Sequence, residues 1–132
     1  MIAQKMKHKF VVLIFLFLVS CGRGPDHSSG EIISTQISQD GQIKALIWSP
    51  DLSGSVGISQ PYEVWVQRLP RGKKELISSA DKTDGIRISW KSPIELDVCY
   101  TDARILRFRG YFWADDHQIE IVLRKIQQLS DC

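Results

Sequence analysis

The sequence has no apolar run long enough to cross a lipid bilayer. Its longest run, residues 10–19, has ten residues, whereas a membrane-spanning helix needs about 20. The chain also has only three cysteines and three histidines. This scarcity leaves few ways to build a cysteine-histidine nucleophile or a metal centre. The sequence therefore argues against a helical membrane span and offers little material for catalysis.

The apolar run nevertheless has the features of a targeting segment. Lysines precede it at positions 5, 7 and 9, and the cysteine at position 21 follows it directly after Ser20. A basic segment, a short apolar segment and small residues before a processing site are typical of a signal peptide. The motif Leu18-Val19-Ser20-Cys21 resembles the lipobox of bacterial lipoproteins.

The resemblance implies a lipid anchor. It implies a cut between Ser20 and Cys21, a diacylglyceryl thioether on Cys21 and an envelope location. Two or more acyl chains hold a protein stably on a bilayer where one chain does not. Gly22 stands where an aspartate retains Gram-negative lipoproteins at the inner membrane, so for a Gram-negative source the resemblance implies an outer membrane location facing the periplasm. We expect a signal peptide at 1–20, a tether at 21–30 and a single β-rich domain at 31–132.

The charge balance changes when the leader is removed. Three of the 17 basic residues lie in residues 1–20 and all 15 acidic residues lie beyond them, so the remaining 112 residues carry 14 positive and 15 negative charges. A net charge of −1 does not support nucleic-acid binding by bulk electrostatics, which requires a strongly basic face. A basic cluster is interpreted as a solvated hairpin tip; it consists of Arg68, Arg71, Lys73 and Lys74.

Two cysteines, Cys99 and Cys132, remain after processing at Cys21. A compartment beyond the inner membrane permits disulfides. A bridge between them would close a loop of 33 residues and fix the C-terminus to the sheet. Two free thiols and an intermolecular disulfide are the alternatives. A catalytic cysteine is disfavoured, because His27 and His117 are the only histidines beyond the leader.

Alternating apolar residues, many of them β-branched or aromatic, predict an all-β fold. We expect an antiparallel meander that forms a small sandwich or an open barrel. Residues 79–85 are expected to form a loop, and Gly110 to mark a bulge or a close contact. The predicted strands cover residues 32–37, 43–48, 62–69, 75–78, 86–90, 94–100 and 104–113.

The last segment, residues 118–129, fits both a strand and a helix. We favour a strand over 118–126, because the aromatic residues just before it are typical of a hairpin. A weaker resemblance covers residues 38–69, where the turn at 38–41 and the loop at 54–59 are similar to a group of small uncharacterised β-rich bacterial proteins. The chain departs from them at Gln39, where their pattern has proline. This resemblance implies no activity.

No group of residues forms a convincing catalytic or metal site. Asp115, Asp116 and His117 are adjacent, and neighbouring side chains on a strand point to opposite faces, so a turn explains them better than a metal ion does. Glu95 and Asp97 share a strand face, which we expect to be solvated. We therefore expect no enzyme activity, no cofactor and no metal.

Four tryptophans remain after the leader is removed, and two of them stand among polar residues. Exposed aromatic residues with arginine are typical of protein interfaces. The sequence predicts a contact patch for an envelope protein partner, made of Trp65, Arg107, Arg109, Tyr111 and Trp113. The interpretation is a membrane-anchored, non-enzymatic protein-binding or scaffolding lipoprotein. The alternatives are a small-ligand-binding or hydrolase-inhibiting lipoprotein, and an enzyme if an acid/base pair converges in a cleft.

Overall fold

The structure, a computed structural model, describes residues 30–50 and 61–132. The predicted signal peptide, Cys21 and the tether up to residue 29 lie outside the described residues. Residues 51–60, which include the loop at 54–59, also lie outside them.

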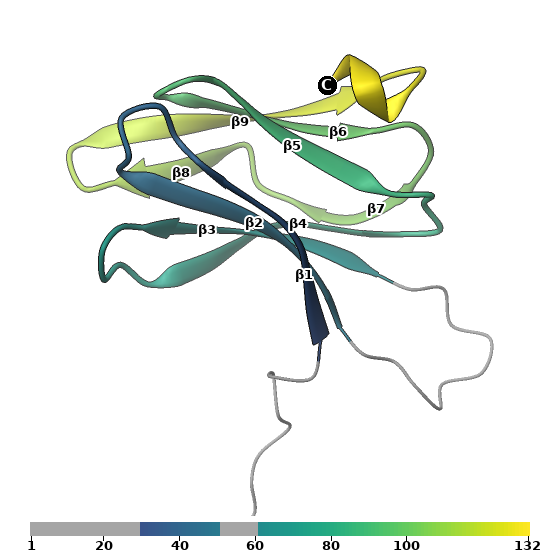
Figure 1. Cartoon of the computed structure of the whole chain (residues 1–132), viewed down its shortest axis with the longest axis horizontal. Coiled ribbons are helices and arrows are strands. Elements are labelled where there is room, and N and C mark those ends of the chain that lie inside the picture. The colour runs from purple at the N-terminus through teal and green to yellow at the C-terminus, as the bar shows by residue number, and fades with distance from the viewer. Residues whose placement is uncertain (1–29, 51–60) are drawn as a thin grey trace, which may run out of the picture.

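The described residues form nine β-strands in two sheets (Figure 1). The five-stranded sheet has the order β1-β2-β3-β4-β7, and the four-stranded sheet has the order β5-β6-β9-β8. The strands are β1 (Gly30–Ile37), β2 (Ile43–Pro50), β3 (Tyr62–Arg68), β4 (Lys74–Asp81), β5 (Ile86–Ser92), β6 (Glu95–Tyr100), β7 (Arg104–Phe108), β8 (Tyr111–Ala114) and β9 (His117–Lys125). The all-β sandwich is confirmed, and so is a strand near the C-terminus.

The core lies between the two sheets and follows the period-two pattern. Alternate residues of each strand point inward, because successive side chains on a strand face opposite sides. Each fully buried aliphatic side chain contributes about 1.5–3 kcal/mol. The five-stranded sheet contributes Ile43, Ala45, Ile47, Val64 and Val66, and the four-stranded sheet contributes Ile88, Leu96, Val98, Ile119 and Ile121.

The connectivity is a meander only through β1 to β4. The chain then forms the β5–β6 hairpin in the other sheet, returns for β7 and crosses again for β8 and β9. As a result β6 and β9 pair in parallel, while the other paired strands are antiparallel. A hairpin turn cannot join two parallel strands, so the longer route through β7 and β8 supplies this connection.

The predicted strand over residues 104–113 is two strands that belong to different sheets. The Arg109 amide donates to the Ile77 carbonyl of β4 at 2.9 Å, whereas the Gly110 carbonyl accepts from the Ile121 amide of β9 at 3.0 Å. Two adjacent residues thus bond to opposite layers, and the chain changes sheet between them. A second difference is that β4 continues to Asp81, where a loop was expected from residue 79.

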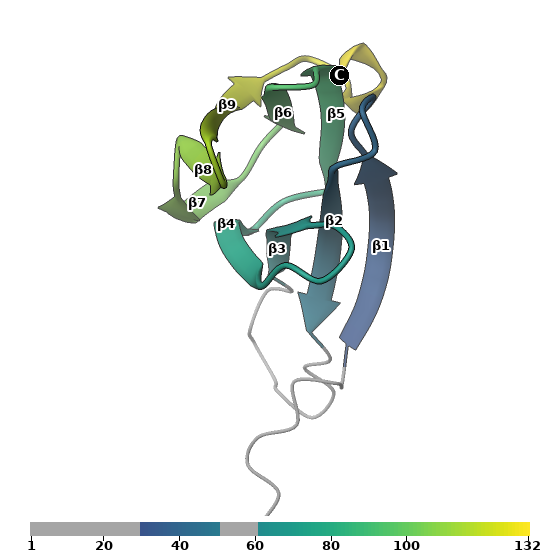
Figure 2. The same ribbon diagram turned by 90° about the vertical axis from the view of Figure 1, so that its left-hand side faces the viewer.

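Figure 2 shows β1 at one margin of the sandwich and β7 with β8 at the opposite margin. At one margin lies β1, whose Gln36 carbonyl accepts a hydrogen bond from Trp90 Nε1 of β5 at 3.2 Å. At the other margin lie β7 and β8, each the last strand of its own sheet. Within the described part of the chain, no helix is long and apolar enough to cross a membrane.

Candidate functional site

Exposed large apolar side chains gather on β7 and β8. Four of the eight found among the described residues lie within the short stretch 106–113. We call this surface the β7–β8 edge and define it as Leu106, Phe108, Tyr111 and Trp113 with the arginines Arg107 and Arg109. Because large exposed apolar patches mark interaction sites more often than scattered single residues do, this edge is the candidate functional site.

The strand β8 presents its two largest aromatic side chains to solvent because of its alternation. Phe112 and Ala114 point into the core, so Tyr111 and Trp113 point outward, and they are 41% and 57% exposed. The strand pairs with β9 on one side, where Trp113 lies opposite Gln118. Tyr111 and Trp113 thus sit on a backbone that the buried neighbours hold in place.

The two arginines of the edge differ in their contacts, since Arg109 has side-chain partners and Arg107 is exposed. The Arg109 guanidinium lies over the Tyr111 ring at 5.1 Å from its centroid, and its Nη1 lies 3.7 Å from Glu75 Oε2 of β4. A cation over an aromatic face is attracted by the ring quadrupole. Arg107 is exposed and lies opposite Ser79 of β4. Arg109 therefore links the two sheets at this margin.

The structure places Trp65 on a strand separate from the other residues of the predicted patch. Trp65 lies on β3 of the five-stranded sheet, opposite Leu46 of β2 and Leu76 of β4, and is half-buried. Its Nε1 donates to Glu63 Oε1 at 3.1 Å. Tyr111 and Trp113 belong to the other sheet. Arg107 and Arg109 bond to β4 of the five-stranded sheet, and the Arg109–Tyr111 contact joins them to β8 across the change of sheet at Gly110.

Leu106 and Phe108 belong to the edge, although sequence reasoning did not assign them to it. Alternation along one strand would turn them away from Arg107 and Arg109, into the core. In the structure β7 is an edge strand with a register shift opposite Ser79 and Ala80 of β4, and both side chains reach solvent. The exposure of these two side chains depends on the pairing of β7 with β4, so the local sequence could not predict it.

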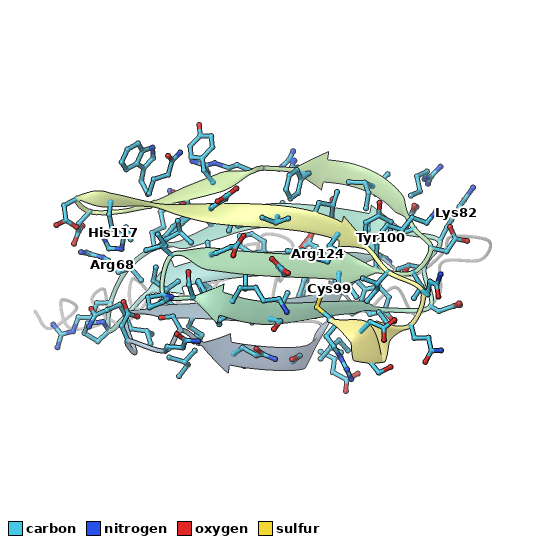
Figure 3. The ribbon with its side chains drawn as sticks, turned by 90° about the horizontal axis from the view of Figure 1, so that it is seen from above. Arg68, Lys82, Cys99, Tyr100, His117 and Arg124 are labelled. Carbon is cyan, nitrogen blue, oxygen red and sulfur yellow. A yellow bond between two sulfur atoms is a disulfide. The ribbon has the colours of Figure 1, made fainter. Side chains whose placement is uncertain are left out.

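Asp97, expected on a solvated face, is fully buried. It lies on β6, and its Oδ2 accepts a hydrogen bond from Nε of Arg124 on β9 at 3.0 Å. Figure 3 shows Arg124 on the four-stranded sheet. Lys91 Nζ lies 3.9 Å from the same oxygen. The other oxygen, Oδ1, has no hydrogen-bond partner among the described residues. A carboxylate held by two cations serves as an ion-pair centre of the sheet rather than as a free acid or base.

Cys99 and Cys132 are joined by a disulfide with a Cα–Cα distance of 5.9 Å. The bridge ties the short 3-10 helix at Leu129–Asp131 to the outer face of the four-stranded sheet. Arg87 of β5 holds the same turn, because its Nη1 donates to the Leu129 carbonyl at 3.2 Å. Neither cysteine is a free thiol here, which removes both from consideration as nucleophiles.

Charged side chains also meet at the hairpin tips at one end of the sandwich, where Figure 3 shows Arg68 and His117. Arg68 forms an ion pair with Asp115. His117 Nδ1 lies 2.9 Å from Asp116 Oδ1, and this contact lowers the pKa of the Asp116 carboxyl. The described residues contain no group of three or more metal-ligating side chains. These charges form pairs at turns.

Comparison with known proteins gives no relative from which a role could be inferred. Neither a scan against protein-family models nor searches of the curated proteins and of the solved structures finds a significant match to this chain. Proposals about function therefore rest on the residues themselves.

Proposed function

We propose that this chain is a lipid-anchored envelope protein that binds a second protein through the β7–β8 edge. The single observation that carries the binding role is the concentration of four exposed large apolar side chains in residues 106–113. The anchor rests on the lipobox motif that ends at Cys21.

The composition of the edge supports a protein partner. Tryptophan, tyrosine and arginine dominate the binding energy of protein interfaces, and they combine apolar area with a polar group. Tyr111 and Trp113 supply the aromatic area, while Arg107 supplies an exposed positive charge. The complementary partner surface would carry an apolar pocket for the rings and carboxylates for the guanidinium groups.

The structure favours binding by side chains over the addition of a foreign strand. An exposed edge strand offers unpaired backbone groups to another chain. The strand β7, however, carries arginines at positions 104 and 107, and charged side chains on an edge oppose such pairing. A side-chain interface also leaves the sandwich unchanged, which suits a protein that stays folded on its anchor.

Crosslinking and capture of the lipidated protein from native membranes test the proposal. Trp113→Ala and Tyr111→Ala should each weaken capture of a specific partner by about 2 kcal/mol, or roughly 30-fold in Kd. Ile94→Ala is the control, because Ile94 is 54% exposed, close to the 57% of Trp113, but lies outside the edge. Binding isotherms with the captured partner would give the Kd values.

If Trp113→Ala and Tyr111→Ala capture the same partners as the unchanged protein, with the same Kd, the edge is not the binding surface. The proposal would equally fail if Ile94→Ala caused the larger loss.

A further inference from the structure

The beginning of β1 carries two adjacent exposed isoleucines, Ile32 and Ile33. In a regular strand, neighbouring side chains face opposite sides. Here the register shifts between Ile32 and Ser34, so Ile33 is an extra residue in the pairing with β2. Such a bulge bends the strand and redirects its side chains. The shift allows both isoleucines to reach solvent at the same end of the strand.

Trp48 extends this apolar surface. It is half-buried and lies opposite Ile32 on the neighbouring strand β2. Its indole covers Gly30, since a Cβ atom at that position would lie only 2.3 Å from Cζ2 of the ring. The absence of a side chain at Gly30 therefore permits the indole to lie over the first residue of the strand. We call Ile32, Ile33 and Trp48 the β1 start.

The chain length between the anchor and the β1 start limits how far apart they can be. Gly30 follows Cys21 by nine residues, and each residue spans at most about 3.6 Å, so Gly30 lies within about 32 Å of Cys21. With Cys21 held at the bilayer, the β1 start would be the first described part of the chain to meet the lipid. A short tether keeps the local concentration of the second contact high even when that contact is weak.

The charges around the β1 start decide which kind of surface fits it. Glu31 lies beside Ile32, and Glu63 is the cross-strand partner of Trp48. Acidic neighbours do not attract the anionic headgroups to which basic patches bind. Aliphatic side chains beside an indole suit the boundary between headgroups and acyl chains, where tryptophan is enriched.

We propose that Ile32, Ile33 and Trp48 dock on the bilayer that holds the acyl chains of Cys21. This inference rests on the lipid anchor of the proposed function. Docking would orient the domain, because the β7–β8 edge lies at the opposite margin of the sandwich (Figure 2). The partner-binding surface would then face away from the lipid.

The test places an environment-sensitive fluorophore at single introduced cysteines in the full-length protein after processing by the cell. Ile32→Cys reports on the β1 start, and Ile37→Cys is the matched control. Both isoleucines lie on β1 with exposures of 57% and 54%, about 16 Å apart along the strand at about 3.3 Å per residue. Cys99 and Cys132 are bonded to each other, so labelling without reductant targets the introduced thiol.

The labelled protein is reconstituted in phosphatidylcholine vesicles whose lipids carry a spin-label quencher near the top of one acyl chain. The Ile32→Cys reporter should be quenched several-fold more than the Ile37→Cys reporter. Its emission should also shift to the blue. Added phosphatidylglycerol should not strengthen either effect, because the contact is apolar.

Mass analysis of the N-terminal peptide separates the failures. An unmodified Cys21 overturns the anchor and the docking together. An acylated Cys21 with equal quenching at both positions overturns the docking alone. A blue shift that grows with protein density but ignores the lipid quencher assigns the β1 start to a second copy of the chain, and it overturns the docking as well.

Discussion

The two margins of the sandwich expose apolar side chains of different kinds. The β1 start exposes aliphatic Ile32 and Ile33 beside acidic residues, next to the predicted tether. The β7–β8 edge exposes Tyr111 and Trp113 beside arginines, at the margin farthest from β1 in Figure 2. Apolar area without positive charge, which includes Trp48 at the β1 start, suits the lipid boundary, whereas aromatic area with arginine suits a protein partner. The difference indicates that exposed apolar area must be interpreted with its neighbouring charges.

The backbone that supports each surface differs as well. At the β1 start, a register shift and a residue without a side chain create the surface. On the β8 half of the β7–β8 edge, ordinary alternation presents Tyr111 and Trp113, with Phe112 and Ala114 fixed in the core. A surface on a regular strand holds its side chains in defined directions, which a specific protein interface requires. A fluid bilayer imposes no such requirement on the β1 start.

Removing the disulfide should cause the largest loss of stability among the changes that leave both surfaces intact. Changing both Cys99 and Cys132 to alanine removes a bridge across a sequence separation of 33 residues. The free energy of unfolding should fall by about 4 kcal/mol on the chain-entropy account. Urea unfolding of the oxidised protein and of the variant measures this change.

Both surfaces depend on the same folded sandwich but not on the C-terminal turn. Under conditions where the variant remains folded, its partner capture and its lipid contact should therefore equal those of the unchanged protein. If one surface lost its function while the other kept it, the two margins would not be independent of the turn. An unchanged unfolding midpoint would refute the stabilising role of the bridge.

The ion-pair centre of the four-stranded sheet offers a smaller effect. Arg124→Met removes the cation that donates to Asp97 and leaves a fully buried carboxylate with Lys91 at 3.9 Å. Because an unpaired buried charge is costly while the partly exposed Arg124 contributes less than a buried one would, we expect a loss of about 2 kcal/mol. Thermal and urea unfolding measure it.

Adding Asp97→Asn to the Arg124→Met variant should recover part of the lost stability, since the buried charge is then absent. Neither variant touches the β1 start or the β7–β8 edge, so both surfaces should keep their partners. A single variant as stable as the unchanged protein would show that water or Lys91 already satisfies Asp97.

The sequence predicted the strand positions, because these depend on local alternation of apolar and polar residues. Strands were predicted at 86–90 and 118–126, and the structure has strands at Ile86–Ser92 and His117–Lys125. It did not predict what depends on the pairing of distant strands. Asp97 is buried by Arg124, a residue 27 positions later that the parallel pairing of β6 and β9 brings close.

At the candidate site, too, the sequence predicted which residues alternate outward but not how distant strands are arranged. Tyr111, Trp113 and the two arginines were predicted as contact residues, and the structure places them at one margin. Trp65 was grouped with them because it stands among polar residues, and a period-two pattern cannot reveal that β4 lies between β3 and β7 in the sheet. The hydrogen bonds of Arg109 and Gly110 to different sheets determine which residues can act together.

The most direct measurement compares the two margins on one lipidated protein. A fluorophore is attached at Ile32→Cys in one sample and at Leu106→Cys in another, both at solvent-exposed positions. Its quenching by the lipid-borne spin label is then measured. We predict strong quenching at position 32 and little at position 106. Equal quenching at both positions, or stronger quenching at position 106, would contradict the assignment of one margin to the lipid and the other to a protein.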